Sequence, residues 1–298
     1  MRSVLIRSLL HILSWMPLPL NHAVGYILGL TLYLVPNKVR RISRINLALC
    51  LPEHTPERRD KLLRASLIEM GKSVTELGPL WLWKPEKLLQ RIRHVVGEDC
   101  MQQAMDHQKG IILLTPHLGC WELNSLFFAN RHPITCLYRP PKLKNLEVFL
   151  NKARQRSGAR LVPTNTTGVK TLYATLAQHD TVGILPDQDP GRGGGIQAPF
   201  FSMHANTIKL IPRLINKTGA RVVMVYAHRL PWGKGYDIHY QTPEDDIYSA
   251  DLLTACTAMN RAVESCIRDN IEQYQWAYKR FKTQADGKPS PYDIHSRQ

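Results

Sequence analysis

A histidine and a glutamate, His117 and Glu122, stand five positions apart in the segment GIILLTPHLGCWE, and their spacing suits acid–base chemistry. The apolar run from Ile111 to Thr115 is typical of a buried strand, which stops at Pro116. A helical pattern of apolar residues follows from Cys120 to Asn130. In one continuous helix the two side chains would lie roughly 140° apart, so we expect the histidine in the turn and the glutamate in the first helical turn. The carboxylate can then reach one ring nitrogen and leave the other free as a base.

The same pair also has a purely structural explanation. A histidine in a strand-to-helix turn commonly caps or packs, and a glutamate in the first turn of a helix is favoured by the helix dipole. Spacing alone therefore does not establish a catalytic role for either residue.

Polar residues also follow two other short apolar runs. Arg139 comes directly after the run Ile134 to Tyr138, and Asp187 and Asp189 follow the run Thr181 to Leu185. In an open α/β sheet the ligand binds beyond the carboxyl ends of the parallel strands. We therefore expect these side chains at the same edge of the sheet as the histidine. Taken singly, the arginine also fits a solvated loop and the aspartates fit turn positions.

Strand and helix patterns alternate from about residue 91 onward. Two more extended segments, 160–162 and 221–226, belong to this alternation. We expect helices at Asn145 to Arg156, Val169 to His179, Thr207 to Lys217 and Ala250 to Ile271. The pattern predicts an α/β fold with a largely parallel sheet flanked by helices. The glycine-rich segment 191–195 lacks the Lys-Ser/Thr of a phosphate loop, and we interpret it as a mobile loop near the site.

The composition indicates a globular protein with an anionic partner. With 298 residues and 44% hydrophobic residues, the chain can bury a sizeable core. Its formal net charge of +15 suits a nucleic acid, an anionic membrane face or an acidic protein, and charge alone does not choose among them. The six cysteines form no CxxC pair, which argues against a zinc site or a disulfide framework and favours a reducing cytoplasm.

The N-terminal residues 3–35 are mostly apolar, but Pro17, Pro19, Asn21 and His22 divide them into two pieces. Each piece is shorter than the roughly 20 residues with which a helix crosses a bilayer. No A-x-A-like cleavage site follows, so a removable signal peptide is not indicated. We expect an uncleaved segment that associates with the membrane, although a buried helical hairpin of a soluble protein has the same pattern.

Basic residues cluster just beyond this segment, at Lys38, Arg40, Arg41 and Arg44. Such a cluster favours the cytoplasmic side of a membrane and anionic head groups, and it also fits the solvated face of a helix. Thr55 and the proline after it are typical of a helix start. We divide the chain into the membrane-associating segment 1–37, a basic helical region 38–90, an α/β domain 91–283 and a polar, loosely held tail 284–298.

Four motifs carry a resemblance to a known family. They are PHLGCWEL around His117, CLYRPPK around Arg139, LPDQDPG with the later Pro199 to Phe201, and the closing WAYKRFK. In this order and spacing they resemble the late acyltransferases of lipid A biosynthesis, which include the lauroyl and myristoyl transferases. The resemblance runs from the N-terminal apolar segment to about Lys282. It implies a glycerolipid-acyltransferase-like fold at the cytoplasmic side of the cell inner membrane.

By this resemblance, His117 removes the proton from a hydroxyl of an anionic glycolipid, a lipid A precursor, and the oxygen attacks the thioester of an acyl carrier protein. Glu122 would hold the ring in its productive tautomer and stabilise the imidazolium. The partners are then the carrier protein, the glycolipid and inner-membrane lipids, with no metal, no other cofactor and no acyl-enzyme. The first amides of the following helix would stabilise the oxyanion. Cys120, between the pair, fits a buried thiol better than a nucleophile.

Four further residues are candidates for substrate binding. Arg139 is the first candidate for binding a phosphate of the glycolipid or of the carrier's pantetheine, and Arg154 is the second. Asp187 and Gln188 would position these groups.

Other functions are compatible with the same residues. The acceptor could be another glycolipid, a mannolipid or an aminolipid, and the same histidine would activate water in a thioesterase or lipid hydrolase. A basic, non-catalytic membrane or nucleic-acid adaptor would explain the charge but not the polar strand ends. The sequence has no helix-turn-helix, zinc-finger or RNP-like pattern, so we expect no nucleic-acid partner.

Overall fold

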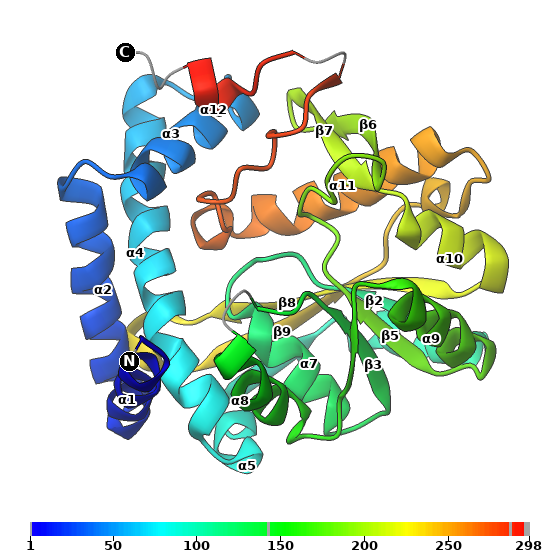
Figure 1. The fold of residues 1–298 in the computed structure, drawn as a ribbon, viewed down its shortest axis with the longest axis horizontal. Helices are drawn as coiled ribbons and strands as arrows, with labels where there is room; N and C mark the ends of the chain where they lie inside the picture. Colours follow the sequence, from blue (N-terminus) through cyan, green and yellow to red (C-terminus); the bar gives the residue numbers. More distant parts are fainter. Residues whose placement is uncertain (1, 142–143, 286–287, 295–298) are drawn as a thin grey trace.

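A seven-stranded sheet lies at the centre of the molecule (Figure 1). The computed structural model describes residues 2–141, 144–285 and 288–294. The strand order is β1-β9-β8-β2-β5-β3-β4, and all neighbours are parallel except β8 and β9. The predicted α/β class with a largely parallel sheet is therefore confirmed. The strands are β1 (Ile92–Val96), β2 (Ile111–Leu114), β3 (Ile134–Tyr138), β4 (Arg160–Pro163), β5 (Thr181–Ile184), β8 (Arg221–Arg229) and β9 (Tyr236–Gln241).

The central strand β2 is buried on both faces, with β8 on one side and β5 on the other. Ile112 and Leu114 belong to one apolar core, whereas Ile111 and Leu113 belong to the other. This alternation is the period of two of an extended chain. The helices that flank the sheet are α6 (Glu98–Asp106), α7 (Trp121–Ala129), α8 (Lys144–Gln155), α9 (Thr166–Ala177), α10 (Leu210–Thr218) and α11 (Leu252–Asp269).

Some strands were not predicted from the sequence. β6 (Gly195–Phe200) and β7 (Met203–Ile208) form a separate antiparallel hairpin. The helix predicted from Thr207 therefore begins only at Leu210. β9, with the sequence YDIHYQ, was not predicted because it holds only one aliphatic residue, although its polar residues alternate as in a half-buried strand. It is held in the sheet by pairing with β8 and β1.

Four longer helices and a short one precede the sheet in the described chain, and the longer four stand at one side of it (Figure 1). They are α1 (Arg2–Trp15), α2 (Leu18–Leu34), α3 (Lys38–Cys50) and α4 (Pro56–Leu82), followed by the short α5 (Pro85–Leu89). The Thr55 hydroxyl accepts a hydrogen bond from the Arg58 amide at 3.3 Å, so the predicted start of α4 is confirmed. α2 packs closely along α4, because a Cβ atom on Gly29 would come within 2.3 Å of the α4 backbone.

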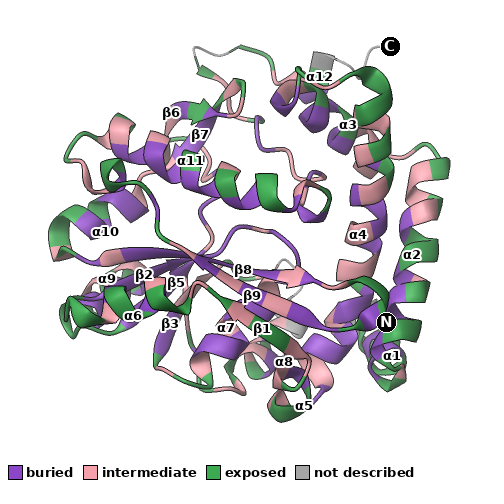
Figure 2. Cartoon of the chain, turned by 180° about the vertical axis from the view of Figure 1, so that it is seen from behind, coloured by how far each residue is buried: buried purple, intermediate pink, exposed green. Residues whose placement is uncertain are grey.

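The outer side of α1 and α2 carries exposed residues, many of them apolar (Figure 2). Asn21 and His22, which divide the apolar segment, are buried on the inner side. Within the described ranges, no helix taken alone has the length and apolar content to cross a bilayer, whereas α2 and α3, bent by 79°, meet that requirement as a pair.

The polar tail is not loose throughout. Tyr292, in the short helix α12 (Pro291–Ile294), is fully buried. Its hydroxyl donates to Oδ1 of Asn46 at 2.5 Å and accepts from the Phe281 amide at 3.1 Å. The expectation of a loose tail is therefore wrong for this part, because one aromatic ring anchors it to α3. Residues 286–287 and 295–298 lie outside the described residues.

Candidate active site

The loop between β2 and α7 places His117 at the carboxyl edge of the sheet. β2 ends at Leu114 and α7 begins at Trp121. Between them Gly119 has a φ of +60°, and a Cβ atom there would lie 2.0 Å from the Ala227 carbonyl oxygen. Glycine is required for both reasons. The loop is thus pressed against β8 before the helix begins.

Backbone hydrogen bonds from the C-terminal part of the chain fix the same loop. The Gly119 amide donates to the Gln273 carbonyl at 3.0 Å, and the Cys120 amide donates to a carbonyl of β8 at 2.8 Å. The Gln275 amide donates to the carbonyl of His117 at 3.0 Å. The amides of Gly119 and Cys120 are thus engaged within the protein, and the oxyanion donors expected at this helix start stay a prediction for the first amides of α7, those of Trp121 and Glu122.

Asp187 is the carboxylate beside His117. Its Oδ1 lies 2.8 Å from Nδ1 of the imidazole, and its Oδ2 accepts a hydrogen bond from the His117 amide at 2.9 Å. Asp187 is buried, and burial alone would raise its pKa. The charge and hydrogen bonds of His117 outweigh burial, so that the net effect lowers the pKa of Asp187. The ionised carboxylate therefore favours the ring tautomer with its proton on Nδ1.

Gln188 occupies the other side of the ring. Its side-chain nitrogen lies 3.0 Å from Nε2 of His117. With the proton on Nδ1, Nε2 carries a lone pair that accepts this hydrogen bond. A hydroxyl that displaces the Gln188 amide would meet an unprotonated nitrogen. The arrangement suits a base at Nε2, and both Asp187 and Gln188 contact the ring.

Glu122 lies in the first turn of α7, as predicted, but its carboxylate binds Arg154 of α8. Nε of Arg154 donates to one carboxylate oxygen at 3.0 Å, and a terminal nitrogen donates to the other. Burial alone would lower the pKa of Arg154, but Glu122 outweighs it and raises that pKa. The expected contact between Glu122 and His117 is wrong in this structure, because α8 supplies a bidentate partner for Glu122 and Asp187 occupies Nδ1. The guanidinium of Arg154, the second candidate for binding a phosphate, is therefore already paired with Glu122.

A cavity of about 330 Å³ opens beside His117. The polar residues that line it include Arg139, exposed at the end of β3, together with Glu122, Arg154 and Gln188. Apolar side chains line the rest, among them Leu113, Ile134, Leu161 and Ile184. Lys142, the last residue of the motif around Arg139, lies outside the described residues. One cavity thus combines charged groups of both signs, including the exposed Arg139, with an apolar interior, which suits a polar molecule that carries an apolar chain.

Two aromatic residues of the site were missed from the sequence. The ring centroid of Trp121 lies 4.9 Å from that of His117, so the indole walls one side of the imidazole. Burial, and then the charge of Asp187, raise the pKa of Tyr274, which stays a neutral phenol beside that carboxylate. Trp121 lies within the motif PHLGCWEL, and Tyr274 lies two residues before the motif WAYKRFK. Their closeness to these motifs was the feature of the sequence that could have identified them.

The thiol of Cys120 is not arranged as a nucleophile. Cys120 is buried, and burial raises its pKa well above the ordinary value. Within the described parts of the chain, no three His, Cys, Asp or Glu side chains gather as metal ligands.

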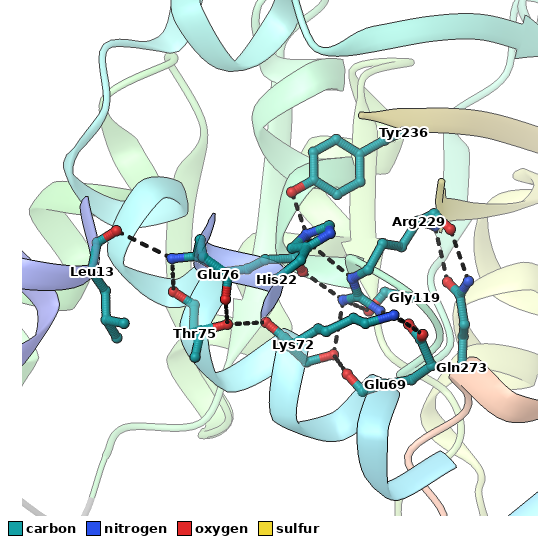
Figure 3. Close-up of polar contacts among 12 residues, drawn as sticks. Leu13, His22, Glu69, Lys72, Thr75, Glu76, Gly119, Arg229, Tyr236 and Gln273 are labelled. Carbon is teal, nitrogen blue, oxygen red and sulfur yellow. Dashed lines mark hydrogen bonds and ion pairs between the residues drawn. The ribbon is translucent and has the colours of Figure 1, made fainter. Parts of the chain in front are cut away.

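A buried ion-pair network connects the N-terminal helices with the active-site loop (Figure 3). Arg229, at the end of β8, donates to Oε1 of Glu76 and to Oε2 of Glu69, both at 2.8 Å. His22 of α2 also contacts Glu76, at 2.7 Å, and Arg229 reaches the Gly119 carbonyl at 3.4 Å. Burial alone would raise the pKa of Glu76, but Arg229 and His22 outweigh it and hold that pKa far below its ordinary value. The network therefore fixes α2 and α4 against the loop that carries His117.

The fold, the histidine at the strand edge and the cavity with polar and apolar walls together fit an acyltransferase. The chain belongs to the bacterial lipid A biosynthesis acyltransferase family, whose sequence model matches residues 3–283.

Individual relatives share this assignment along most of their length. The chain is 30% identical over 255 residues to the lipid A biosynthesis palmitoleoyltransferase of Escherichia coli (strain K12), covering 84% of this chain and 81% of that protein. It is 29% identical over 279 residues to the lauroyltransferase of the same organism, covering 93% and 90%. The identity to its myristoyltransferase is 27% over 260 residues, covering 85% and 78%. The three relatives are named for different acyl chains, so the likeness supports acyl transfer more strongly than a particular chain length.

Proposed function

We propose that this acyltransferase moves a fatty acyl chain from the thioester of an acyl carrier protein to a hydroxyl of a phosphorylated lipid A precursor. The reaction takes place at the cytoplasmic face of the inner membrane and uses no cofactor. The observation that carries the proposal is the His117 ring, held by Asp187 at Nδ1 with Nε2 directed to a cavity that has cationic and apolar walls. Membership in a family of lipid A acyltransferases supports the acceptor class.

The proton moves through Nε2 of His117. The acceptor hydroxyl replaces the Gln188 amide, gives its proton to Nε2, and its oxygen forms a bond to the thioester carbon. The imidazolium is stabilised by the ionised, buried Asp187. As the carbon–sulfur bond breaks, the thiolate of the carrier takes the same proton, and the ester and the free carrier thiol leave.

Two arginines of the cavity wall interact with negative charge on the substrates and in the transition state. Arg139 is exposed and lines the cavity, where it binds a phosphate of the acceptor or of the carrier's pantetheine arm. Arg154 keeps its positive charge through Glu122 and lies in the same cavity wall, where it favours the negative charge that develops on the thioester oxygen. Glu122 therefore acts by positioning Arg154.

The two substrates react in one ternary complex. Cys120, three positions after the histidine in sequence, is buried and stays protonated. Direct attack by the hydroxyl therefore accounts for transfer without an acyl-enzyme.

A transfer assay separates this reaction from hydrolysis by a thioesterase. Purified protein in detergent is incubated with radiolabelled lauroyl-, myristoyl- or palmitoleoyl-carrier protein, with or without a phosphorylated lipid A precursor. The proposal predicts label in the glycolipid and little free fatty acid when the acceptor is absent. Fatty acid released equally with and without acceptor would identify a thioesterase. His204→Ala, at an exposed histidine of β7, is the matched control for His117→Ala.

A further inference from the structure

The outer faces of α1 and α2 form an exposed apolar surface that is a candidate for membrane contact. Among their exposed apolar residues are Leu5, Leu9 and Trp15 of α1 and Leu20, Ile27 and Leu34 of α2. No acidic residue precedes Glu53, so the whole region carries only positive formal charge. An apolar, acid-free surface matches a bilayer interface with anionic head groups better than it matches water.

The inner face of α2 is committed to the protein along its length. Gly25 and Gly29 admit the α4 backbone at distances that no Cβ atom would tolerate. The Asn21 amide donates to the carbonyls of Leu13 and Thr75 at 3.1 and 2.9 Å. A helix that crosses a bilayer beside one neighbour would bring that neighbour with it, yet α4 places the charged Lys72, paired with Glu69, beside Gly25 in the middle of α2. The packing therefore favours α2 lying along the membrane surface rather than through it.

A second tryptophan from a distant part of the sequence lies at the beginning of α2. Trp232, in the turn between β8 and β9, is 83% exposed. Its φ of +58° is unfavourable for a side chain other than glycine, and no burial of the indole compensates for that. The adjacent Gly233 abuts Pro19, where a Cβ atom would meet the Pro19 nitrogen at 2.5 Å. Trp232 and Trp15, which is 79% exposed, therefore flank the α1–α2 turn, and indoles prefer membrane interfaces.

The other end of α2 leads to a basic groove. A hollow of about 800 Å³ is lined by Pro36, Lys38, Arg40, Arg41 and Arg44 and by apolar residues of α3. Other residues of α3, among them Ile42 and Leu47, are buried against the protein. Lys38 and Arg44 are exposed and Arg40 and Arg41 are half-buried, so this groove presents positive charge where phospholipid head groups would lie.

We propose that α1, α2, the Trp232 turn and the basic face of α3 form one surface that binds an anionic bilayer, with α2 in the plane of the interface. This proposal deepens, and rests on, the membrane location given under the proposed function. Arg7 of α1 stacks over Phe149 of α8 at 5.5 Å, and α8 also supplies Arg154 to the cavity wall. The arrangement brings that wall beside the bilayer, so a lipid acceptor can reach the cavity without leaving the membrane.

Spin-label depth measurements test the orientation. Full-length Trp232→Cys, Ile27→Cys and Lys217→Cys proteins are labelled and bound to vesicles of phosphatidylethanolamine and phosphatidylglycerol, with the unmutated protein as the labelling blank. Ile27 lies midway along the outer side of α2, and Lys217 is exposed on α10. Helix α10 stands on the opposite side of the molecule from α2 (Figure 1). We expect labels at 27 and 232 at a similar depth of about 5–10 Å and a water-exposed label at 217. A label at 27 near the bilayer centre, about 15 Å deep, or a water-exposed label at 232 would overturn the proposal.

Vesicle partitioning tests Trp232 separately. Trp232→Ser should weaken binding about tenfold, Trp232→Phe should weaken it less, and Lys217→Ser should leave it unchanged. Equal partitioning of the serine variant and the unmutated protein would show that Trp232 does not belong to the membrane-binding surface. The phenylalanine variant keeps the test valid if the serine variant folds poorly. Neither measurement needs a substrate. If the labels lie at the expected depths but the protein shows no acyl transfer, the proposed function is refuted and the proposed membrane-binding surface is supported.

Discussion

Replacing Asp187 by Asn should disable the base while leaving the cavity in place. In the structure Oδ2 of Asp187 accepts from the His117 amide at 2.9 Å and Oδ1 faces Nδ1 at 2.8 Å. An asparagine can keep the first hydrogen bond only by directing its NH₂ group at Nδ1. The ring would then carry its proton on Nε2, where the acceptor hydroxyl needs a lone pair.

The expected loss follows from this change of tautomer. A positioned general base typically contributes about 10²–10⁴-fold to the rate. With 1.36 kcal/mol for each factor of ten, the loss corresponds to about 2.7–5.4 kcal/mol of the activation barrier. The loss should appear in kcat, with KM for the carrier thioester little changed, since neither atom of the contact binds the thioester.

The assay is steady-state acyl transfer in detergent with purified variants. His117→Ala, Asp187→Asn and the double variant are compared, and Asp180→Asn, an exposed aspartate just before β5, is the control. Because His117 and Asp187 act as one unit, the double variant should lose little more than His117→Ala alone. An Asp187→Asn protein within threefold of the original rate, or a double loss equal to the product of the single losses, would refute the reasoning.

Three further predictions follow from the other polar contacts. Glu122→Gln and Arg154→Gln should each lower kcat, and the double variant should resemble either single one because the residues form a bidentate pair; multiplicative losses in the same assay would contradict this. Arg139→Lys should lower kcat/KM for a phosphorylated acceptor about tenfold or more, since a point charge does not reproduce a guanidinium fork, and unchanged kinetics would return Arg139 to a solvated loop residue. Glu76→Gln should lower the free energy of unfolding by about 3–5 kcal/mol, measured by denaturant titration in detergent, because Arg229 loses a buried partner. The lowered pKa of Glu76 means that its contribution is present above about pH 4.3 and is lost as the pH falls further, so a variant with the same pH dependence as the original protein would contradict the pairing.

The sequence predicted the sheet and the strand edge because both depend on local patterns. The runs that became β2, β3 and β5 are short, apolar and bounded by Gly, Pro or Asp, and their carboxyl ends meet because the strands are parallel neighbours. His117 and Asp187 were therefore expected at one edge, although 70 positions separate them.

The pairing of side chains within the site was not predictable in the same way. Glu122 is near His117 in the chain, which favoured a direct contact, but α8 brings Arg154 to the carboxylate from 32 positions away. The Arg229–Glu76 pair, with 153 positions between its members, had no local signal at all. Likewise, Tyr292 alone ties down a segment whose average composition is that of a loose tail.

Mass spectrometry of membrane glycolipids tests the central claim most directly. Cells that lack this protein are complemented with the unmutated chain, with His117→Ala or with the control His204→Ala. Our account predicts a glycolipid heavier by one acyl ester with the unmutated chain and with the control, and only the lighter precursor with His117→Ala at equal protein level. Restoration of the heavier glycolipid by His117→Ala would contradict the assignment of His117 as the base, and identical glycolipids in all strains would contradict the transfer itself.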